Sequence, residues 1–270
     1  MNIKEGYLVR HPKRLEWGQG KVVARNGDIV EVFFEKTKQT KKLSLEYAHF
    51  TGVINSNLND LLNEIFFPCF GFYKSYNKFT QAQIAEDGFT PIILDIKNGN
   101  MELIQTFQER FIKLISYFDK YFKNTVLCTP PPHAKNSISG IRIFSEQLIN
   151  NYDFTDGLSI LERTIDTEKN TFARKSKEQQ KETITINNED LFENKAVCLL
   201  DDISTTGATL DACEDLLYEN GAKIVIKFCL AKTVGAWDYE NNKDTHKNFN
   251  DFYQEKIQFL NKIKGNKDLI

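Results

Sequence analysis

The chain has few cysteines, and no two of them stand close together in the sequence. The cysteines are scattered over 270 residues: Cys69, Cys128, Cys198, Cys213 and Cys229. Most of them lie within apolar patterns that predict buried strands or a helix. This spacing argues against a disulfide framework and against a cysteine-type zinc site, and it predicts reduced, buried thiols in a cytoplasmic protein.

Long apolar runs and an excess of charge of one sign are also lacking. No run of about eighteen apolar residues occurs, and no charged start leads into an apolar segment, so we expect neither a membrane span nor a signal peptide. The formal net charge is −2 and the pI is near 6.2, which does not favour broad, non-specific nucleic-acid binding. A local basic patch is still compatible with this balance.

The length and the 41% hydrophobic content predict a globular protein with one large domain or two unequal ones. No internal repeat is visible. The patterns divide the chain into four parts: a small β-barrel at 1–50, a linker or lid at 51–90, an α/β core at 91–235 and a helical tail at 236–270.

The most informative stretch runs from Val197 to Leu210. Four apolar residues come first, then Asp201 and Asp202, then small hydroxylated residues around Gly207, and then a helical pattern. The apolar run predicts a strand that is buried on both faces, as in a parallel sheet covered by helices. We therefore expect a ligand at the carboxyl end of this strand.

The segment after the strand predicts a turn that opens a helix over Thr206 to Asn220. Backbone N–H groups are free at a helix start and the helix dipole favours anions there, so the turn suits a phosphate. Gly207 allows close approach of the anion. Asp201 and Asp202 cannot bind that phosphate, but they suit sugar hydroxyls or a Mg²⁺ ion that keeps most of its waters.

This stretch resembles the phosphoribosyl-pyrophosphate-binding signature of type I phosphoribosyltransferases. The resemblance implies that the acidic pair holds the ribose hydroxyls and Mg²⁺ and takes part in catalysis, and that the turn holds the 5′-phosphate. The implied site residues are Asp201, Asp202, Ser204, Thr205, Thr206, Gly207, Ala208 and Thr209. The alternative is an ordinary strand, turn and helix with a polar N-cap, but a cap needs one Ser or Thr and does not need the acidic pair.

Strands and helices alternate through the predicted core, which indicates right-handed crossovers and a central parallel sheet with helices on both faces. The expected strands are 91–96, 125–128, 158–161, 183–186, 195–203 and 222–230, and the expected helices are 101–122, 137–150 and 206–220. The fold class is therefore α/β, and it agrees with the Rossmann-like core that the resemblance implies.

Three consecutive prolines, Pro130 to Pro132, follow the strand at 125–128 and predict a rigid, extended turn. The resemblance places the pyrophosphate-binding loop here and makes His133 and Lys135 candidates for pyrophosphate contact. Prolines followed by His also resemble the ComF-type branch of the family. That branch normally has an Arg-Gly element where this chain has Ser139-Gly140, and a cysteine-rich zinc module that this chain lacks.

The segment from Arg163 to Lys181 is charged and nearly free of apolar anchors, so we expect it to be mobile in the free protein. Its position is that of the family's flexible catalytic loop, which closes over the site. Arg174 and Lys175 are the catalytic candidates that this position implies. The alternative is a solvated surface loop.

Residues 1–50 show short alternating strands around the Asn26-Gly27 turn, a pattern typical of a hairpin. The stretches from Val9 to Pro12 and from Trp17 to Val23 resemble SH3/Tudor-like modules of bacterial helicases and transcription factors. A basic face that includes Arg10 and Trp17 predicts a nucleic-acid or acidic protein partner. In the alternative, Trp17 packs under its own loop.

Two functions fit these observations. The first is a transferase that binds phosphoribosyl pyrophosphate with Mg²⁺ and passes the phosphoribosyl group to an unidentified nitrogenous acceptor. The second is a non-catalytic sensor or adaptor, tethered through residues 1–50 to DNA-uptake, repair or transcription machinery. We expect the tail helix, with Phe252 and Leu260 on one side, to pack on the core, with a homodimer contact as the alternative.

Overall fold

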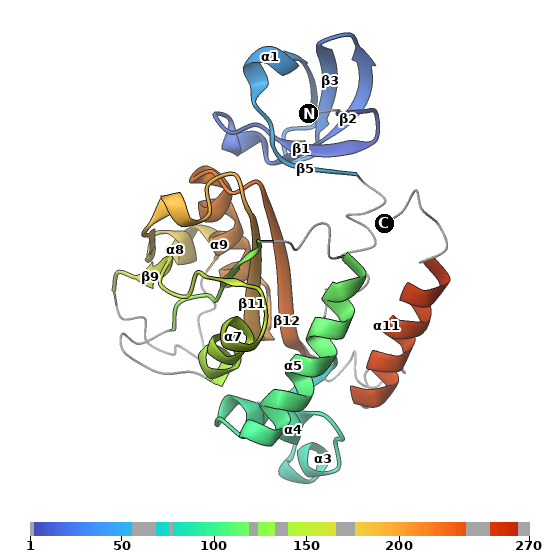
Figure 1. Ribbon diagram of the computed structural model, residues 1–270, viewed down its shortest axis with the longest axis vertical. Coiled ribbons are helices and arrows are strands. Elements are labelled where there is room, and N and C mark those ends of the chain that lie inside the picture. The colour runs from blue at the N-terminus through green and yellow to red at the C-terminus, as the bar shows by residue number, and fades with distance from the viewer. Residues whose placement is uncertain are drawn as a thin grey trace.

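The computed structural model describes residues 3–55, 69–75, 78–118, 124–132, 140–165, 176–235 and 249–263. These residues form an N-terminal antiparallel sheet and a larger α/β core (Figure 1).

The N-terminal sheet has five antiparallel strands in the order β4-β3-β2-β1-β5. Its strands are β1 (Tyr7–Arg10), β2 (Gln19–Asn26), β3 (Ile29–Phe34), β4 (Gln39–Ser44) and β5 (Thr51–Asn55), with the short helices η1 (Leu15–Trp17) and α1 (Leu45–Ala48) between them. Asn26 pairs with Ile29 and Gly27 has a φ of 61°, so the predicted hairpin is confirmed. The sequence did not predict β5, which pairs with β1.

The N-terminal sheet has a hydrophobic core of its own. Buried valines and Phe34 fill it, and the ring centroid of Trp17 lies 5.1 Å from that of Phe34 and 5.2 Å from that of His11. Trp17 is only partly exposed. The indole therefore packs against its own module, as the simpler of the two sequence interpretations proposed.

The core sheet has the strand order β6-β12-β11-β7-β8, and every neighbouring pair in it is parallel. Its strands are β6 (Phe72–Lys74), β7 (Val126–Cys128), β8 (Thr155–Asp156), β11 (Ala196–Ser204) and β12 (Ile224–Val234). A separate antiparallel pair is formed by β9 (Leu161–Arg163) and β10 (Ile184–Ile186). The predicted α/β fold with a parallel sheet is confirmed.

Helices cover both faces of this sheet. The described helices of the core are α3 (Gln81–Ala85), α4 (Thr90–Lys97), α5 (Met101–Ile115), η2 (Ser116–Phe118), α7 (Gly140–Asn151), α8 (Lys177–Lys181), η3 (Glu189–Leu191), α9 (Ala208–Glu219) and α11 (Phe249–Ile263). Figure 1 shows α8 and α9 on one side of the β11–β12 pair and α5 and α11 on the other. As expected, the tail helix α11 packs on the core, where it buries Tyr253 and Leu260.

Alternation along β11 explains why this strand reads as one apolar run. Cys198 and Leu200 pack into the cluster that contains α5 and α7, whereas Val197 and Leu199 pack into the cluster that contains α9. Both faces of the strand are thus removed from water, which is the usual environment of a parallel strand between helices.

The predicted strand at Pro91 to Ile96 is wrong, because these residues form helix α4. The isoleucines favoured a strand, but Pro91 occupies the first turn of a helix, where a missing N–H costs nothing. The carboxylate of Asp87 accepts a hydrogen bond from the Thr90 N–H at 2.8 Å, so it caps the helix start. Two strands of the core sheet were not expected: β6, from the stretch interpreted as a linker or hood-like segment, and β8. The expected core strands at 158–161 and 183–186 instead contribute to the antiparallel pair of β9 and β10, outside the parallel sheet.

Two further expectations are corrected. The predicted strand at Leu158 to Leu161 is displaced: its first residues form a turn, and β9 begins at Leu161. The segment from Arg163 to Lys181 is folded at both ends, since Arg163 is buried in β9 and Lys177–Lys181 forms α8 behind a capping box at Ser176. Residues 166–175 lie outside the described residues.

The cysteine prediction is confirmed, because all five thiols are free and buried. Burial raises the pKa of Cys198 to about 12. Among the described helices, none is long and apolar enough to cross a membrane.

Candidate functional site

The direction of the strand order reverses between β7 and β11. The chain leaves β7 through α7 toward β8 on one side, and it leaves β11 through α9 toward β12 on the other. β7 ends at Cys128, which pairs with Leu199, so β11 continues beyond the end of β7 and carries Asp201 and Asp202 past it. In open parallel sheets, ligands bind at such a reversal point.

Asp201 and Asp202 lie at this point, near the end of β11. The Asp201 carboxylate accepts a hydrogen bond from the Asp202 N–H at 2.9 Å, and the Asp202 carboxylate accepts one from the Ile203 N–H at 2.6 Å. Each of these bonds uses one carboxylate oxygen, Oδ1. The structure thus brings the two acidic residues together at the carboxyl edge of the sheet.

Burial and the neighbouring Asp202 carboxylate together raise the pKa of Asp201 to about 8. Two carboxylates in one desolvated place resist ionising together. In the free protein, Asp201 therefore keeps its proton to a higher pH than an ordinary aspartate does. A cation or a hydroxyl donor that binds there favours the ionised form and releases this proton.

Thr205 to Gly207 form the turn between β11 and α9. Gly207 is the N-cap residue with a φ of 81°, a left-handed conformation that suits glycine, and its carbonyl oxygen accepts the first helical hydrogen bond from Asp211 at 2.8 Å. A Cβ at Gly207 would meet nothing closer than 3.9 Å. The space above this glycine is open, as a phosphate cradle requires.

The hydroxyls of the turn point in defined directions. Thr206 Oγ1 accepts from the Ala208 N–H at 3.4 Å, and Thr205 Oγ1 lies 2.9 Å from Thr233 Oγ1 at the end of β12. Thr205 and Thr206 are exposed and Thr209 is partly exposed, whereas Ser204 is buried. A ligand above the turn can reach the three threonines more readily than Ser204.

A cation that the sequence interpretation did not include stands beside the acidic pair. Lys97 Nζ, from the last turn of α4, lies 3.5 Å from Asp202 Oδ2. Because the segment around Lys97 read as the end of a strand, nothing in the sequence pattern directed attention to this side chain. Only the approach of α4 to the sheet edge places it here.

Arg163 is the second residue that sequence reasoning placed wrongly. Its guanidinium donates to Pro131 O and Pro132 O at 3.4 Å each, to Gln180 Oε1 at 3.0 Å and to Thr183 Oγ1 at 2.6 Å. Burial lowers its pKa. Arg163 therefore does not belong to a mobile charged loop. It holds the proline turn against α8 and against Thr183, which directly precedes β10.

The other predicted site residues lie outside the described residues: His133, Lys135, Arg174 and Lys175. The described part of the turn ends at Pro132 and resumes at Gly140. The described part of the charged segment ends at Ile165 and resumes at Ser176.

The donor set fits Mg²⁺ better than a protein-only metal centre. Among the described residues, no group of three or more His, Cys, Asp or Glu side chains is placed to hold a metal ion. The site offers two adjacent carboxylates, each with one oxygen free of the backbone bonds above. Mg²⁺ typically takes one or two carboxylates together with waters and substrate oxygens.

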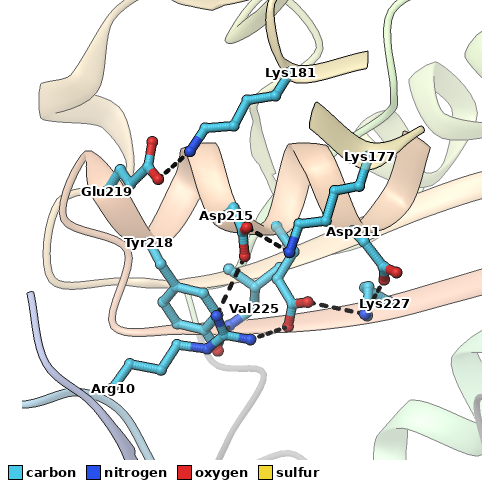
Figure 2. A network of polar contacts seen from close by, with 10 residues as sticks. Arg10, Lys177, Lys181, Asp211, Asp215, Tyr218, Glu219, Val225 and Lys227 are labelled. Atoms are coloured by element: carbon cyan, nitrogen blue, oxygen red, sulfur yellow. Dashed lines mark hydrogen bonds and ion pairs between the residues drawn. The ribbon is translucent and has the colours of Figure 1, made fainter. Parts of the chain in front are cut away.

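The N-terminal sheet docks on the helix that the candidate turn opens. Arg10 of β1 forms ion pairs with Glu214 and Asp215 of α9, at 3.5 and 3.3 Å (Figure 2). The Arg10 side chain is only 16% exposed. The expectation that Arg10 belongs to an exposed basic face is therefore wrong.

Further ion pairs extend this network along α9. Lys177 binds Asp215 at 2.5 Å, Lys181 pairs with Glu219, and Lys227 binds Asp211 and Glu214 at 2.7 and 2.9 Å (Figure 2). Burial acts to lower the pKa of Lys227, but the two carboxylates outweigh it and the pKa is raised. The acidic side chains of α9 thus pair with cations of the N-terminal sheet, α8 and β12.

Comparison with known proteins identifies two regions of the chain. The phosphoribosyl transferase domain family matches residues 144–261, and a family described as a protein of unknown function, DUF3553, matches residues 3–42. No curated protein matches the chain.

Among solved structures, the chain is similar to hypoxanthine phosphoribosyltransferases. The Staphylococcus aureus enzyme is 16% identical with a TM-score of 0.29, and the match covers 53% of this chain and 76% of that one. The Trypanosoma cruzi enzyme is 10% identical with a TM-score of 0.34, and the match covers 57% and 93%. These similarities are too low to support conclusions about this chain. The chain thus combines a region at 3–42 that matches DUF3553 with an α/β core in which residues 144–261 match the phosphoribosyl transferase domain family.

Proposed function

We propose that the protein binds phosphoribosyl pyrophosphate together with Mg²⁺ and transfers the phosphoribosyl group to a nitrogenous acceptor, with release of pyrophosphate. The observation that carries this proposal is the position of Asp201 and Asp202. They lie at the reversal point of the parallel sheet, directly before a left-handed glycine turn that opens a helix. Carboxylates suit the ribose hydroxyls, and the turn suits the 5′-phosphate.

In this proposal the acceptor nitrogen attacks the anomeric carbon while the bond to pyrophosphate breaks and its electron pair leaves with the pyrophosphate. Mg²⁺, held by Asp201, Asp202 and ligand oxygens, would neutralise charge on the leaving group. The protein's own part is to hold the ribose by its hydroxyls and by its 5′-phosphate, so that the anomeric carbon is oriented toward the acceptor. Proton loss from Asp201 accompanies binding, because the ligand and its cation favour the carboxylate.

The test is calorimetric titration of magnesium and phosphoribosyl pyrophosphate into the wild type and into Asp201→Asn with Asp202→Asn. Loss of two charged contacts should weaken binding by about tenfold or more. A matched control changes another adjacent acidic pair, Glu189→Gln with Asp190→Asn, which is exposed on η3. Equal affinity of the double variant and the wild type would contradict the proposed site.

The alternative, a non-catalytic sensor or adaptor, is favoured by the docking of the N-terminal sheet. Arg10 ties this sheet to α9, so occupancy of the turn at the start of α9 has a physical route to the N-terminal module. Incubation with magnesium, labelled phosphoribosyl pyrophosphate and pools of bases separates the two functions. Release of pyrophosphate supports the transferase, and binding without release supports the adaptor.

We also propose that residues 1–55 form an SH3/Tudor-like module that recruits a protein or nucleic-acid partner. Five short antiparallel strands around a core of valines support this proposal. Two lysines of the predicted basic face have acidic neighbours, since Lys42 binds Glu31 at 3.0 Å and Lys38 pairs with Glu35. The likeness of the core to the ComF-type branch is a proposal that rests on the proline turn alone.

A further inference from the structure

Lys97 pairs with Asp202, the second member of the acidic pair at the carboxyl edge of the sheet. Its ammonium lies 3.5 Å from Asp202 Oδ2, and its side chain is 45% exposed. Asp202, in contrast, is 16% exposed. The Lys97 ammonium therefore pairs with Asp202 and is at the same time open to solvent, so an incoming ligand can reach it.

The backbone at Lys97 is held in place by the start of α7. A Cβ at Gly140 would collide with the carbonyl oxygen of Ile96 and would lie 2.7 Å from the Cα of Lys97. Only glycine fits at this contact, because any larger residue would push α7 away from α4. The position of Lys97 is thus tied to the first residue of α7.

The same residue, Gly140, closes the proline-rich connection from β7. This connection leaves β7 after Cys128, beside β11, and Arg163 holds it at the carbonyl oxygens of Pro131 and Pro132. It returns to the described structure at Gly140, against Lys97. Lys97 therefore lies between the acidic pair and the far end of this connection.

At that far end the sequence has Ser139-Gly140, and Arg142 in the first turn of α7 is already engaged by Glu146 and by the Leu158 carbonyl oxygen. A trianionic leaving group at this edge would need a cation close to the helix start. On the α4 side, the Lys97 backbone lies against Gly140 and its ammonium pairs with Asp202, and a four-carbon stem gives the ammonium several ångströms of reach.

We propose that Lys97 binds the pyrophosphate moiety of the ligand and exchanges its contact with Asp202 for phosphate oxygens when the ligand enters. This inference rests on the proposed function, because it assigns one further residue to the same site. The exchange is favourable because a terminal oxygen of pyrophosphate carries more negative charge than a carboxylate oxygen. Asp202 does not lose its partner, since it then binds the ribose and Mg²⁺. Lys97 thus supplies from α4 a positive charge for the leaving group.

The experiment measures two affinities separately. Wild type, Lys97→Met and Lys97→Arg are titrated with inorganic pyrophosphate in magnesium and, independently, with ribose 5-phosphate. Lys97→Met should weaken pyrophosphate binding by about tenfold or more, as expected for a lost charge-assisted hydrogen bond. Its affinity for ribose 5-phosphate should stay within about twofold of the wild type, because the 5′-phosphate site is at the α9 turn.

The first control makes the same substitution, lysine to methionine, at a position away from the proposed site. Lys113→Met removes an exposed lysine from the last turn of α5 and should change neither affinity. Lys97→Arg should retain most of the pyrophosphate affinity. A thermal melt of each variant shows whether it is folded, and Lys97→Gln serves as a second neutral variant if the methionine variant is not.

Two results would overturn the assignment. Wild-type affinity of Lys97→Met for pyrophosphate would show that this lysine only pairs with Asp202, and an equal loss of both affinities would show a structural role. Failure of the wild type to bind either ligand is a different result, since it would remove the proposed function itself and the role of Lys97 with it.

Discussion

The guanidinium carbon of Arg10 lies 4.6 Å from the centroid of the Tyr218 ring. This contact joins the first strand of the N-terminal sheet to the last turn of α9, the helix that opens with the candidate phosphate turn. The hydroxyl of Tyr218 in turn accepts a hydrogen bond from the Val225 N–H at 2.9 Å. The two modules thus meet at the amino end of β12, at the opposite end of the sheet from the proposed ligand site.

We expect Arg10→Ala to destabilise the protein by about 1–3 kcal/mol, because partly buried ionic hydrogen bonds and a cation–π contact are lost together. Glu214 and Asp215 keep other partners in Lys227 and Lys177, which limits the cost. Urea unfolding measures the effect.

Arg10→Lys is the matched control, since it keeps the charge but loses the planar fork. We expect it to be intermediate. If both variants unfold like the wild type, the docking of the two modules does not depend on Arg10.

We expect the core to fold without residues 1–55. The N-terminal sheet has its own hydrophobic core, but β5 extends this sheet to Asn55, so a cut after residue 50 would leave a strand unpaired. The shortened protein should melt cooperatively but at a lower temperature, because Tyr218 loses its cover. Loss of a cooperative transition in calorimetry would show that the N-terminal sheet is an integral part of the core.

We expect the stability of the wild type to fall as the pH rises from about 4 to about 8 through the contribution of Asp201. In this window the folded protein holds a proton on Asp201 that the unfolded chain has lost, so raising the pH favours unfolding. Asp201→Asn should remove this contribution. Urea unfolding at several pH values measures it, and Asp95→Asn, on the exposed side of α4, is the control that should keep the wild-type slope.

Ligand binding should show the same titration. Below the pKa of Asp201, binding of phosphoribosyl pyrophosphate with magnesium should release a proton, because the bound cation needs the carboxylate. Calorimetry in two buffers of different ionisation enthalpy detects this release. Identical heats in both buffers near pH 7 would contradict the ionisation of Asp201 on binding.

We expect Arg163→Met to destabilise the fold by about 1–3 kcal/mol and to weaken pyrophosphate binding. The methionine fills the space but leaves buried oxygens of Pro131, Gln180 and Thr183 without their donor. Arg163→Lys should restore little, since one ammonium cannot reach both the proline carbonyls and Thr183. Urea unfolding and pyrophosphate titration test this, and unchanged binding with reduced stability would confine Arg163 to a structural role.

The sequence alone determined the elements whose signals are local. The apolar run before Asp201 predicted β11, the hydroxyl-rich turn around Gly207 predicted the start of α9, and Asn26-Gly27 predicted the β2–β3 hairpin. In each case, neighbouring residues carry both the pattern and the geometry, so no distant contact is needed to specify the structure.

The tertiary structure decided what depends on residues far apart in the chain. The isoleucines between Pro91 and Ile96 are compatible with a strand or with a helix. The helix forms because the Asp87 carboxylate accepts a hydrogen bond at its start and because its apolar side packs against the sheet. That choice put Lys97 beside Asp202. Likewise, Arg10 and Arg163 read as exposed cations, because a sequence does not show which carboxylates or carbonyls will surround an arginine once the chain folds.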